Sequence, residues 1–150
     1  MGSTGLLFED IFEVQARDPA GKKFDKVSRY QCHSDLYECD LTLDVNLDVY
    51  PLEVGSKYQL ALASTLNLDG SAGSTKYDAT FPGISGKPSL MDRYEYVMYG
   101  KVYKYRDTQQ AGQIKVEIYV SFGGLLMLLV GDPRKLQDLE VDSSVYLLMR

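Results

Sequence analysis

The sequence has 150 residues, a formal net charge of −5 and 45% apolar residues. This length fits one domain that needs no disulfide or structural metal, so we expect a single domain over residues 1–150. The acidic balance argues against a dedicated nucleic-acid binder, because phosphate contacts need clustered Lys and Arg. The longest apolar run, Leu125–Val130, is too short to span a bilayer, and Met1–Gly5 lacks the pattern of a secretory signal. We therefore expect no membrane association and two reduced cysteines.

The beginning of the chain is ambiguous. Leu7, Phe8, Ile11 and Phe12 have a spacing that fits a short helix as well as a strand. The residues that follow, Asp18-Pro19-Ala20-Gly21, predict a turn.

The clearest strand pattern covers Cys39–Tyr50. Apolar side chains occupy its odd positions and mostly polar side chains its even ones, which predicts one face in a core and the other in water. Pro51 is expected to end this strand, since proline cannot donate to a ladder. Another strand is predicted where Tyr58, Leu60 and Leu62 alternate with small residues.

The composition changes between Leu68 and Leu90, where Gly, Ser and Pro dominate. Such a segment cannot bury enough apolar surface to offset its ordering entropy. We expect a long mobile loop at about 68–90, which interrupts the domain without dividing it.

The second half of the chain predicts four more strands. Tyr94–Tyr105 is rich in Tyr and Val, with Gly100 at a position typical of a bulge or a barrel corner. Ile114–Phe122 alternates strictly, and Leu125–Val130 is a continuous apolar run expected to be buried on both faces. Val145, Leu147 and Met149 alternate with their neighbours in the last strand.

These patterns predict an all-β protein. About eight strands with turn signals between them form a closed antiparallel barrel or a sandwich, and an OB-fold-like barrel with extra strands is one natural solution. No strong helix is predicted. Only Asp132–Leu139 is compatible with one helical turn, with Asp132 as N-cap and Pro133 at the first position.

The sequence offers few candidates for catalysis or metal binding. His33 is the single histidine, and we interpret it as a surface residue at a hairpin. Cys32, His33 and Cys39 lack the second ligand pair of a structural zinc site, so the cysteines are interpreted as packing residues. We expect no cofactor, no metal and no catalytic residues.

Two further motifs have structural interpretations. Asp40, Asp44 and Asp48 share one strand face, but positions four apart on a strand are about 13 Å apart, too far for one ion. We interpret them as a solvated acidic face. Gly123-Gly124 is followed by no Lys-Ser or Lys-Thr and opens no helix, so it predicts a tight turn and not a phosphate loop.

Tyrosine is the unusual feature, with 12 residues and no tryptophan. Five tyrosines crowd the segment from Tyr94 to Tyr105. One interpretation is a platform on which single-stranded nucleic acid stacks. The other is a core combined with a protein interface, where tyrosine supplies both area and a hydroxyl group. The acidic total favours the second.

Six segments, taken together, resemble the eighth subunit common to eukaryotic nuclear RNA polymerases I, II and III. Their order along the chain is that of the family, and the resemblance extends from Leu7 to Arg150, apart from the Gly/Ser loop and residues 104–115. The segments are Leu7–Phe12, Gly21–Arg29, Leu43–Asn46, Glu95–Tyr103, Tyr119–Met127 and Val141–Met149.

The resemblance implies an eight-stranded antiparallel barrel of OB-like type, with Leu7–Ala16 as a strand and a variable loop at 68–90. It also implies a nuclear, non-catalytic subunit that docks on the largest polymerase subunit, away from the catalytic magnesium. Nucleic acid would then be contacted only indirectly, through the complex, and no homo-oligomer is expected.

Aromatic density and the Gly-Gly pair lead us to expect the partner interface in the second half of the barrel. The predicted interface residues are Tyr96, Tyr99, Tyr103, Phe122, Gly123, Gly124 and Leu125. The alternative function is an OB-type single-stranded nucleic-acid-binding module, and an enzyme is the least supported class.

Overall fold

The computed structural model describes residues 6–19, 21, 25–65, 94–110 and 112–150. The loop predicted at about 68–90 lies outside these residues. Eight strands are present: β1 (Leu6–Arg17), β2 (Val27–Ser34), β3 (Asp40–Asn46), β4 (Lys57–Ala63), β5 (Tyr96–Gln110), β6 (Gln113–Phe122), β7 (Leu125–Gly131) and β8 (Ser144–Met149). The described part of the chain contains no helix long and apolar enough to cross a membrane.

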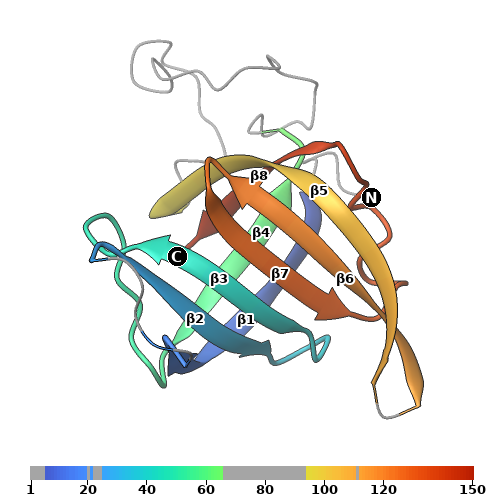
Figure 1. The fold of residues 1–150 in the computed structure, drawn as a ribbon, viewed down its shortest axis with the longest axis horizontal. Coiled ribbons are helices and arrows are strands. Elements are labelled where there is room, and N and C mark those ends of the chain that lie inside the picture. Colours follow the sequence, from blue (N-terminus) through green and yellow to red (C-terminus); the bar gives the residue numbers. More distant parts are fainter. Residues whose placement is uncertain (1–5, 20, 22–24, 66–93, 111) are drawn as a thin grey trace.

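The strands form one closed barrel in the order β1-β2-β3-β7-β6-β5-β8-β4, and β4 pairs with β1 to complete it (Figure 1). Every neighbouring pair is antiparallel. The predicted all-β antiparallel barrel is therefore confirmed. The N-terminal segment is a strand, as the resemblance implies, with a bulge between Val14 and Ala16.

The barrel interior is filled by alternate residues of the strands. Leu41, Leu43 and Val45 of β3 are buried, as their odd positions predict. The same holds for Val116, Ile118, Val120 and Phe122 of β6, whereas Ile114 is 64% exposed because β7 pairs with β6 only from Val116 onward. Burial of these side chains, at roughly 25 cal/mol per Å² of apolar surface, is the main stabilising contribution to the fold.

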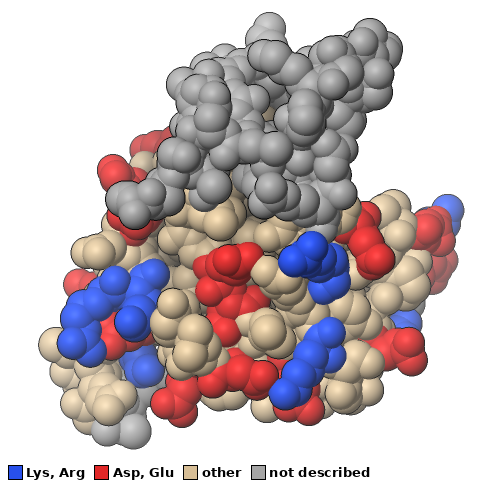
Figure 2. Space-filling view, turned by 180° about the vertical axis from the view of Figure 1, so that it is seen from behind, with Lys and Arg blue, Asp and Glu red and all other residues tan. Residues whose placement is uncertain are grey.

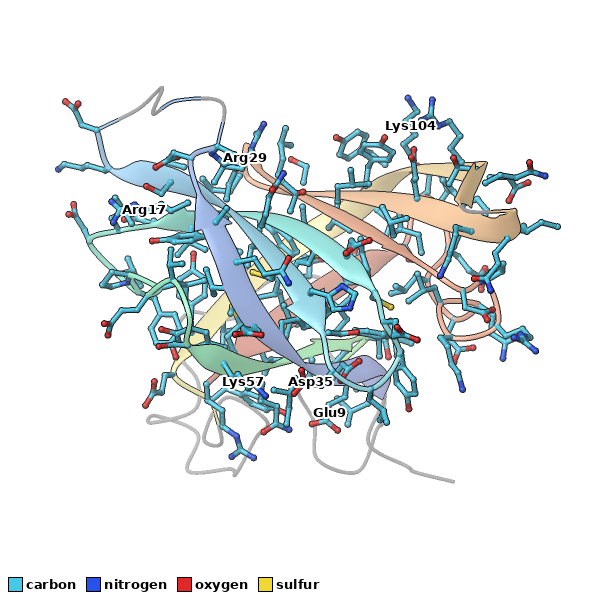
Figure 3. The ribbon with its side chains drawn as sticks, turned by 90° about the horizontal axis from the view of Figure 1, so that it is seen from below. Glu9, Arg17, Arg29, Asp35, Lys57 and Lys104 are labelled. Carbon is cyan, nitrogen blue, oxygen red and sulfur yellow. The ribbon has the colours of Figure 1, made fainter. Side chains whose placement is uncertain are left out.

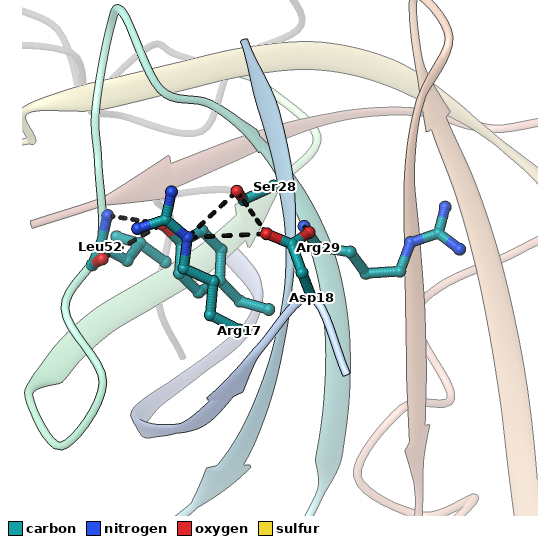
Figure 4. Close-up of polar contacts among 6 residues, drawn as sticks. Arg17, Asp18, Ser28, Arg29 and Leu52 are labelled. Carbon is teal, nitrogen blue, oxygen red and sulfur yellow. Dashed lines mark hydrogen bonds and ion pairs between the residues drawn. The ribbon is translucent and has the colours of Figure 1, made fainter. Parts of the chain in front are cut away.

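Polar contacts connect the end of β1 with the beginning of β2 (Figure 4). The Ser28 hydroxyl donates to Asp18 Oδ2 at 2.7 Å and accepts from Arg17 Nε at 3.2 Å. Asp18 Oδ1 also accepts from the backbone N–H of Arg29. Asp18 has φ +48°, and Gly21 N–H donates to its carbonyl oxygen, as the predicted turn requires.

The prediction that β3 extends to Tyr50 is wrong. The strand ends at Asn46, whose side-chain oxygen accepts from the N–H of Asp48 and whose carbonyl oxygen accepts from Val49 and Tyr50. This turn competes with the ladder, because an Asn side chain can replace a strand partner. Val49 is consequently exposed despite its apolar pattern position.

One expectation in the second half of the chain is also corrected. Leu125–Val130 is not buried on both faces, because Leu126 is 37% exposed.

Asp132–Leu139 forms consecutive turns and no regular helix, in agreement with the expectation of no strong helix and at most one turn here. The N–H of Lys135 donates to the carbonyl oxygen of Asp132, and Asp132 Oδ1 accepts from Arg134 N–H as an N-cap would.

Gly100 allows two strands to approach closely, and the β5 bulge lies two residues further on, between Val102 and Lys104. A Cβ added at Gly100 would lie 2.3 Å from the carbonyl oxygen of Ser121 and 2.6 Å from the Phe122 ring. Glycine is therefore required here for steric reasons.

A second apolar cluster lies on the outward face of β4, β8 and β5. It consists of Ala61, Ala63, Tyr146 and Leu148, with Leu6, Tyr94, Val97 and Tyr99 packed against it. The four central residues are buried although they alternate with side chains that point into the barrel. This part of the outer surface is therefore already covered.

Candidate docking surface

Two of the predicted interface residues belong to the barrel core. Tyr96 is 4% exposed and Phe122 is 5% exposed, and both pack in the main cluster. The Tyr96 ring stacks on Tyr50, with ring centroids 5.3 Å apart, and burial raises its pKa. These two side chains hold β5 and β6 in place and are not presented to a partner.

Tyr99 points outward but packs within the second apolar cluster. Its ring lies against Tyr146, with centroids 4.9 Å apart. The two residues are direct partners in the β5–β8 register. Tyr99 therefore borders the exposed part of β5 and is itself half-buried.

Gly123 and Gly124 form the two-residue turn between β6 and β7, with Phe122 opposite Leu125. Their φ angles are +63° and +102°, which matches the hairpin turns that favour glycine. Both are exposed, and a Cβ added at either position would meet nothing within 4 Å. The structural interpretation of this pair as a tight turn is confirmed.

Leu125 is half-buried and packs against the core, whereas the next residue, Leu126, points outward. The sequence does not reveal this difference, because a continuous apolar run has no alternation that shows which residues point outward. In the structure, Leu126 pairs with Ser121 and Leu128 pairs with Tyr119, and these pairs determine which residues point outward.

Tyr103 is the most exposed of the predicted tyrosines, at 46%. Its ring contacts that of Tyr119 on the neighbouring strand, with centroids 6.0 Å apart. The Lys104 ammonium lies 5.2 Å from the centre of the Tyr119 ring. The Tyr119 hydroxyl donates to Glu117 at 3.0 Å, and this bond raises the pKa of Tyr119.

We call the outward surface around these residues the Tyr103 face. It comprises Tyr103, Lys104, Tyr119, Leu126, Leu128 and the turn Gly123-Gly124. Figure 3 shows Arg29 and Lys104 on one side of the barrel and Glu9, Asp35 and Lys57 on the other. The face thus combines exposed aromatic and aliphatic groups with nearby cations, a composition typical of protein interfaces.

Asp44 joins this face to the first half of the barrel. It accepts two hydrogen bonds from Arg29, at 2.7 and 3.1 Å, and a third from the N–H of Leu126 at 3.0 Å. These contacts bury Asp44, so the interpretation of the three aspartates as one solvated face is wrong at this position. Asp40 and Asp48 are exposed as predicted.

His33 contacts one carboxylate, and the two cysteines are buried in the core. His33 lies near the end of β2, half-buried, with Nδ1 2.9 Å from Asp40 Oδ1. Cys32 and Cys39 are buried free thiols, and burial raises the pKa of Cys32 to about 12 and that of Cys39 to about 11. In the residues the structure describes, no three His, Cys, Asp or Glu side chains come together as metal ligands.

Charges of both signs are mixed on the opposite side of the molecule. Figure 2 shows acidic and basic side chains interspersed there, without a continuous basic track. On the Tyr103 side, Arg106 is ion-paired with Glu117 at 2.7 Å. On the face that Figure 2 shows, the described residues therefore do not form a contiguous basic stripe, the electrostatic footprint of a dedicated nucleic-acid site.

Residues 9–150 match the family model described as RNA polymerase Rpb8. The chain is 50% identical over 148 residues to the DNA-directed RNA polymerases I, II, and III subunit rpabc3 of Dictyostelium discoideum, covering 98% of each chain. It is 50% identical to the DNA-directed RNA polymerases II, IV and V subunit 8B of Arabidopsis thaliana, over 100% of this chain and 99% of that one. Identity to the RPABC3 subunit of Saccharomyces cerevisiae is 37%, over 98% and 99% of the two chains.

Proposed function

The chain belongs to the RNA polymerase Rpb8 family, and on this basis we propose that it is a non-catalytic subunit of nuclear DNA-directed RNA polymerases that docks on the largest subunit. The observation that carries the proposal is the match along nearly the whole chain to relatives named as subunits shared by several polymerases. The same relatives support a nuclear location.

The Tyr103 face is the proposed contact with the rest of the enzyme. Tyr99, Tyr103, Gly123, Gly124 and Leu125, taken from the sequence prediction, lie on this face or at its border. Leu126 and Tyr119 extend it, whereas Tyr96 and Phe122 support it from inside. An exposed aromatic and aliphatic patch is the kind of surface that subunit association buries.

Purification of the chain from cells, followed by mass spectrometry, tests the main proposal. The largest polymerase subunit is expected to co-purify with the chain. Its absence from a preparation in which the chain is folded would contradict the assignment.

Substitutions test the location of the interface. Leu126→Asp places a charge on the Tyr103 face and is expected to reduce incorporation severely, because an unpaired buried charge is costly at an interface. Ile11→Asp is the matched control, since Ile11 is an exposed aliphatic residue on β1, three strands from β7 around the barrel. Equal incorporation of the two variants would remove the Tyr103 face as the docking site.

Single-stranded nucleic-acid binding is the second candidate. The observation in its favour is that Tyr103 is exposed and its ring contacts Tyr119, beside Lys104, as on a stacking platform. The net charge of −5 and the Arg106–Glu117 ion pair weaken it. Fluorescence titration of the chain with oligonucleotides decides between the two: micromolar binding that weakens steeply with salt would support the second candidate.

A further inference from the structure

Among the residues that the structure describes, none forms a strand beside one edge of the long strand β5 over its second half. β5 pairs with β8 only over Tyr96–Lys101, whereas its pairing with β6 continues to Gln110. Beyond Lys101, the last backbone contact on the β8 side is that of Val102, which bonds to Asp142 and Ser143. In the described part of the chain, the edge from Tyr103 to Gln110 is therefore open. Figure 1 shows the β5–β6 hairpin reaching beyond the body of the barrel.

The register indicates which backbone groups point to this edge. The N–H and C=O of Val102 point away from β6, toward residues 142–143. The bulge then places Tyr103 and Lys104 together opposite Tyr119, which shifts the alternation by one residue. Since groups alternate along an antiparallel strand, three residues direct their N–H and C=O to the open edge: Tyr105, Asp107 and Gln109.

This edge is only partly protected against pairing. The bulge at Val102–Lys104 and the charges of Lys104 and Arg106 are protections that natural edges use, but the open stretch beyond the bulge is long, and Tyr103–Gln110 contains no Pro or Gly. We propose that this edge receives an extended segment of another polymerase subunit, which adds a strand beside β5; the inference rests on the proposed function for its partner. Strand addition of this kind supplies affinity through main-chain bonds and specificity through alternate side chains.

The side chains beside the edge define the chemistry of that segment. On the outward face lie Lys104 and Arg106, and Lys104 forms no ion pair with any described residue. On the other face lie Tyr105, which is 41% exposed, Asp107 and Gln109, and Ile114 lies beyond Tyr105 on β6. Since Arg106 is already paired with Glu117, the edge fits a segment that places an acidic side chain beside Lys104 and an apolar one beside Tyr105.

A second copy of the chain fits the edge poorly. Antiparallel self-pairing would bring the Lys104 and Arg106 side chains of two copies together, and like charges on neighbouring strands repel. Each copy also carries a net charge of −5, which opposes association of two copies.

Hydrogen exchange measured residue by residue tests the proposal. In the isolated chain, the amides of Tyr105, Asp107 and Gln109 should exchange fast, and those of their neighbours bonded to β6 slowly. In purified polymerase containing the chain, the three edge amides should slow by about tenfold or more, as expected for newly bonded groups. Unchanged fast exchange in the assembled enzyme would overturn the proposal. Presence of the chain in that enzyme tests the proposed function separately.

A proline substitution provides a second test. Asp107→Pro removes an N–H directed to the edge and leaves the β6 ladder bonds in place, a position that proline tolerates. Asp107→Ala is the control, because it changes the same side chain and keeps the N–H. We expect the proline variant to fold and to be incorporated at least tenfold less than the alanine variant, roughly 1.4 kcal/mol in an equilibrium. Equal incorporation would overturn the proposal, as would a dimer of the isolated chain with protected edge amides.

Discussion

Arg29 on β2 lies directly opposite Asp44 on β3, and the two form an ion pair through two hydrogen bonds of 2.7 and 3.1 Å. The same carboxylate accepts from the N–H of Leu126 on β7. One buried carboxylate therefore connects three consecutive strands of the barrel, next to the turn Gly123-Gly124. The hydrogen bond to Asp44 is the main cause of the raised pKa of Arg29.

Replacement of Asp44 should destabilise the barrel clearly. Asp44→Ala leaves the Leu126 N–H and the Arg29 guanidinium without their acceptor, which costs about 1–3 kcal/mol. Urea unfolding measures this loss. Asp48→Ala is the control, because Asp48 is an aspartate of the same sequence pattern whose ion pair with Lys26 has both side chains exposed. This substitution should change the free energy of unfolding by less than about 0.5 kcal/mol. Equal effects of the two variants would contradict the role given to Asp44.

Gly131 and Cys39 should behave as a coupled pair. A Cβ at Gly131 would lie 2.6 Å from Cys39 Sγ, so Gly131→Ala alone overpacks the site and should cost about 1–3 kcal/mol. Cys39→Ala removes that sulfur atom, and the double variant should lose less stability than the sum of the single variants. A double-mutant cycle in urea measures the coupling.

Gly100→Ala provides the contrast to this pair. Its added Cβ would meet the backbone carbonyl of Ser121, which no side-chain substitution removes. Cys39→Ala should therefore leave the cost of Gly100→Ala unchanged. The packing would differ from that described if the effects of Gly131→Ala and Cys39→Ala were additive, or if Cys39→Ala reduced the cost of Gly100→Ala.

Gly123 of the β6–β7 turn should tolerate Asn better than Val. Gly123 has φ +63°, a conformation that Asn adopts, so Gly123→Asn should change the free energy of unfolding by less than about 1 kcal/mol. Gly123→Val should cost more than Asn, because a β-branched residue is a genuine outlier at positive φ. Thermal unfolding of the two variants gives the comparison, and equal melting temperatures would argue against this turn geometry.

The cysteines should resist modification in the folded chain. Burial raises the pKa of Cys32 to about 12 and that of Cys39 to about 11, from 9.0, and the thiolate is the reactive form. Iodoacetamide at pH 8 should therefore label neither thiol in the native protein and both in urea, as mass spectrometry would show. Rapid native labelling of either cysteine would contradict its buried position.

The same shifts predict a loss of stability at alkaline pH. A thiol whose pKa is higher in the folded state keeps its proton there, while the unfolded chain loses it near pH 9. Stability from these groups is thus fully present below pH 9.0 and declines as pH rises from 9 toward 11 and 12. Urea midpoints measured between pH 7 and 10 should fall only at the upper end, and the Cys32→Ala, Cys39→Ala variant should show a smaller decline.

Periodicity was sufficient for most of the fold. Strict alternation identified the inward residues of β3 and, apart from the exposed Ile114, those of β6, because one side of each strand faces a core that excludes polar groups. It failed at Asn46, where a side-chain acceptor replaces the strand partner, and at Leu126, where a uniform apolar run hides which residues point outward. These two failures have different causes: local hydrogen bonding in the first and strand pairing in the second.

The candidate surface was less accessible to sequence reasoning. Aromatic density led to Tyr103 and Tyr96 together, yet the first is exposed and the second is stacked in the core. Only the strand register separates them, because the two residues point to opposite sides of β5. The open edge of β5 was also invisible in the sequence, since it depends on where β8 stops.

The position of β8 has a consequence for how the protein is made. This strand is inserted between β4 and β5, so neither of those strands has its second neighbour until residues 144–149 have been synthesised. A nascent chain that ends before this segment holds two unpaired edges and cannot close its barrel. Ring closure therefore has to wait for the last of the eight strands, and chains interrupted before residues 144–149 are expected to be substrates for chaperones and proteases.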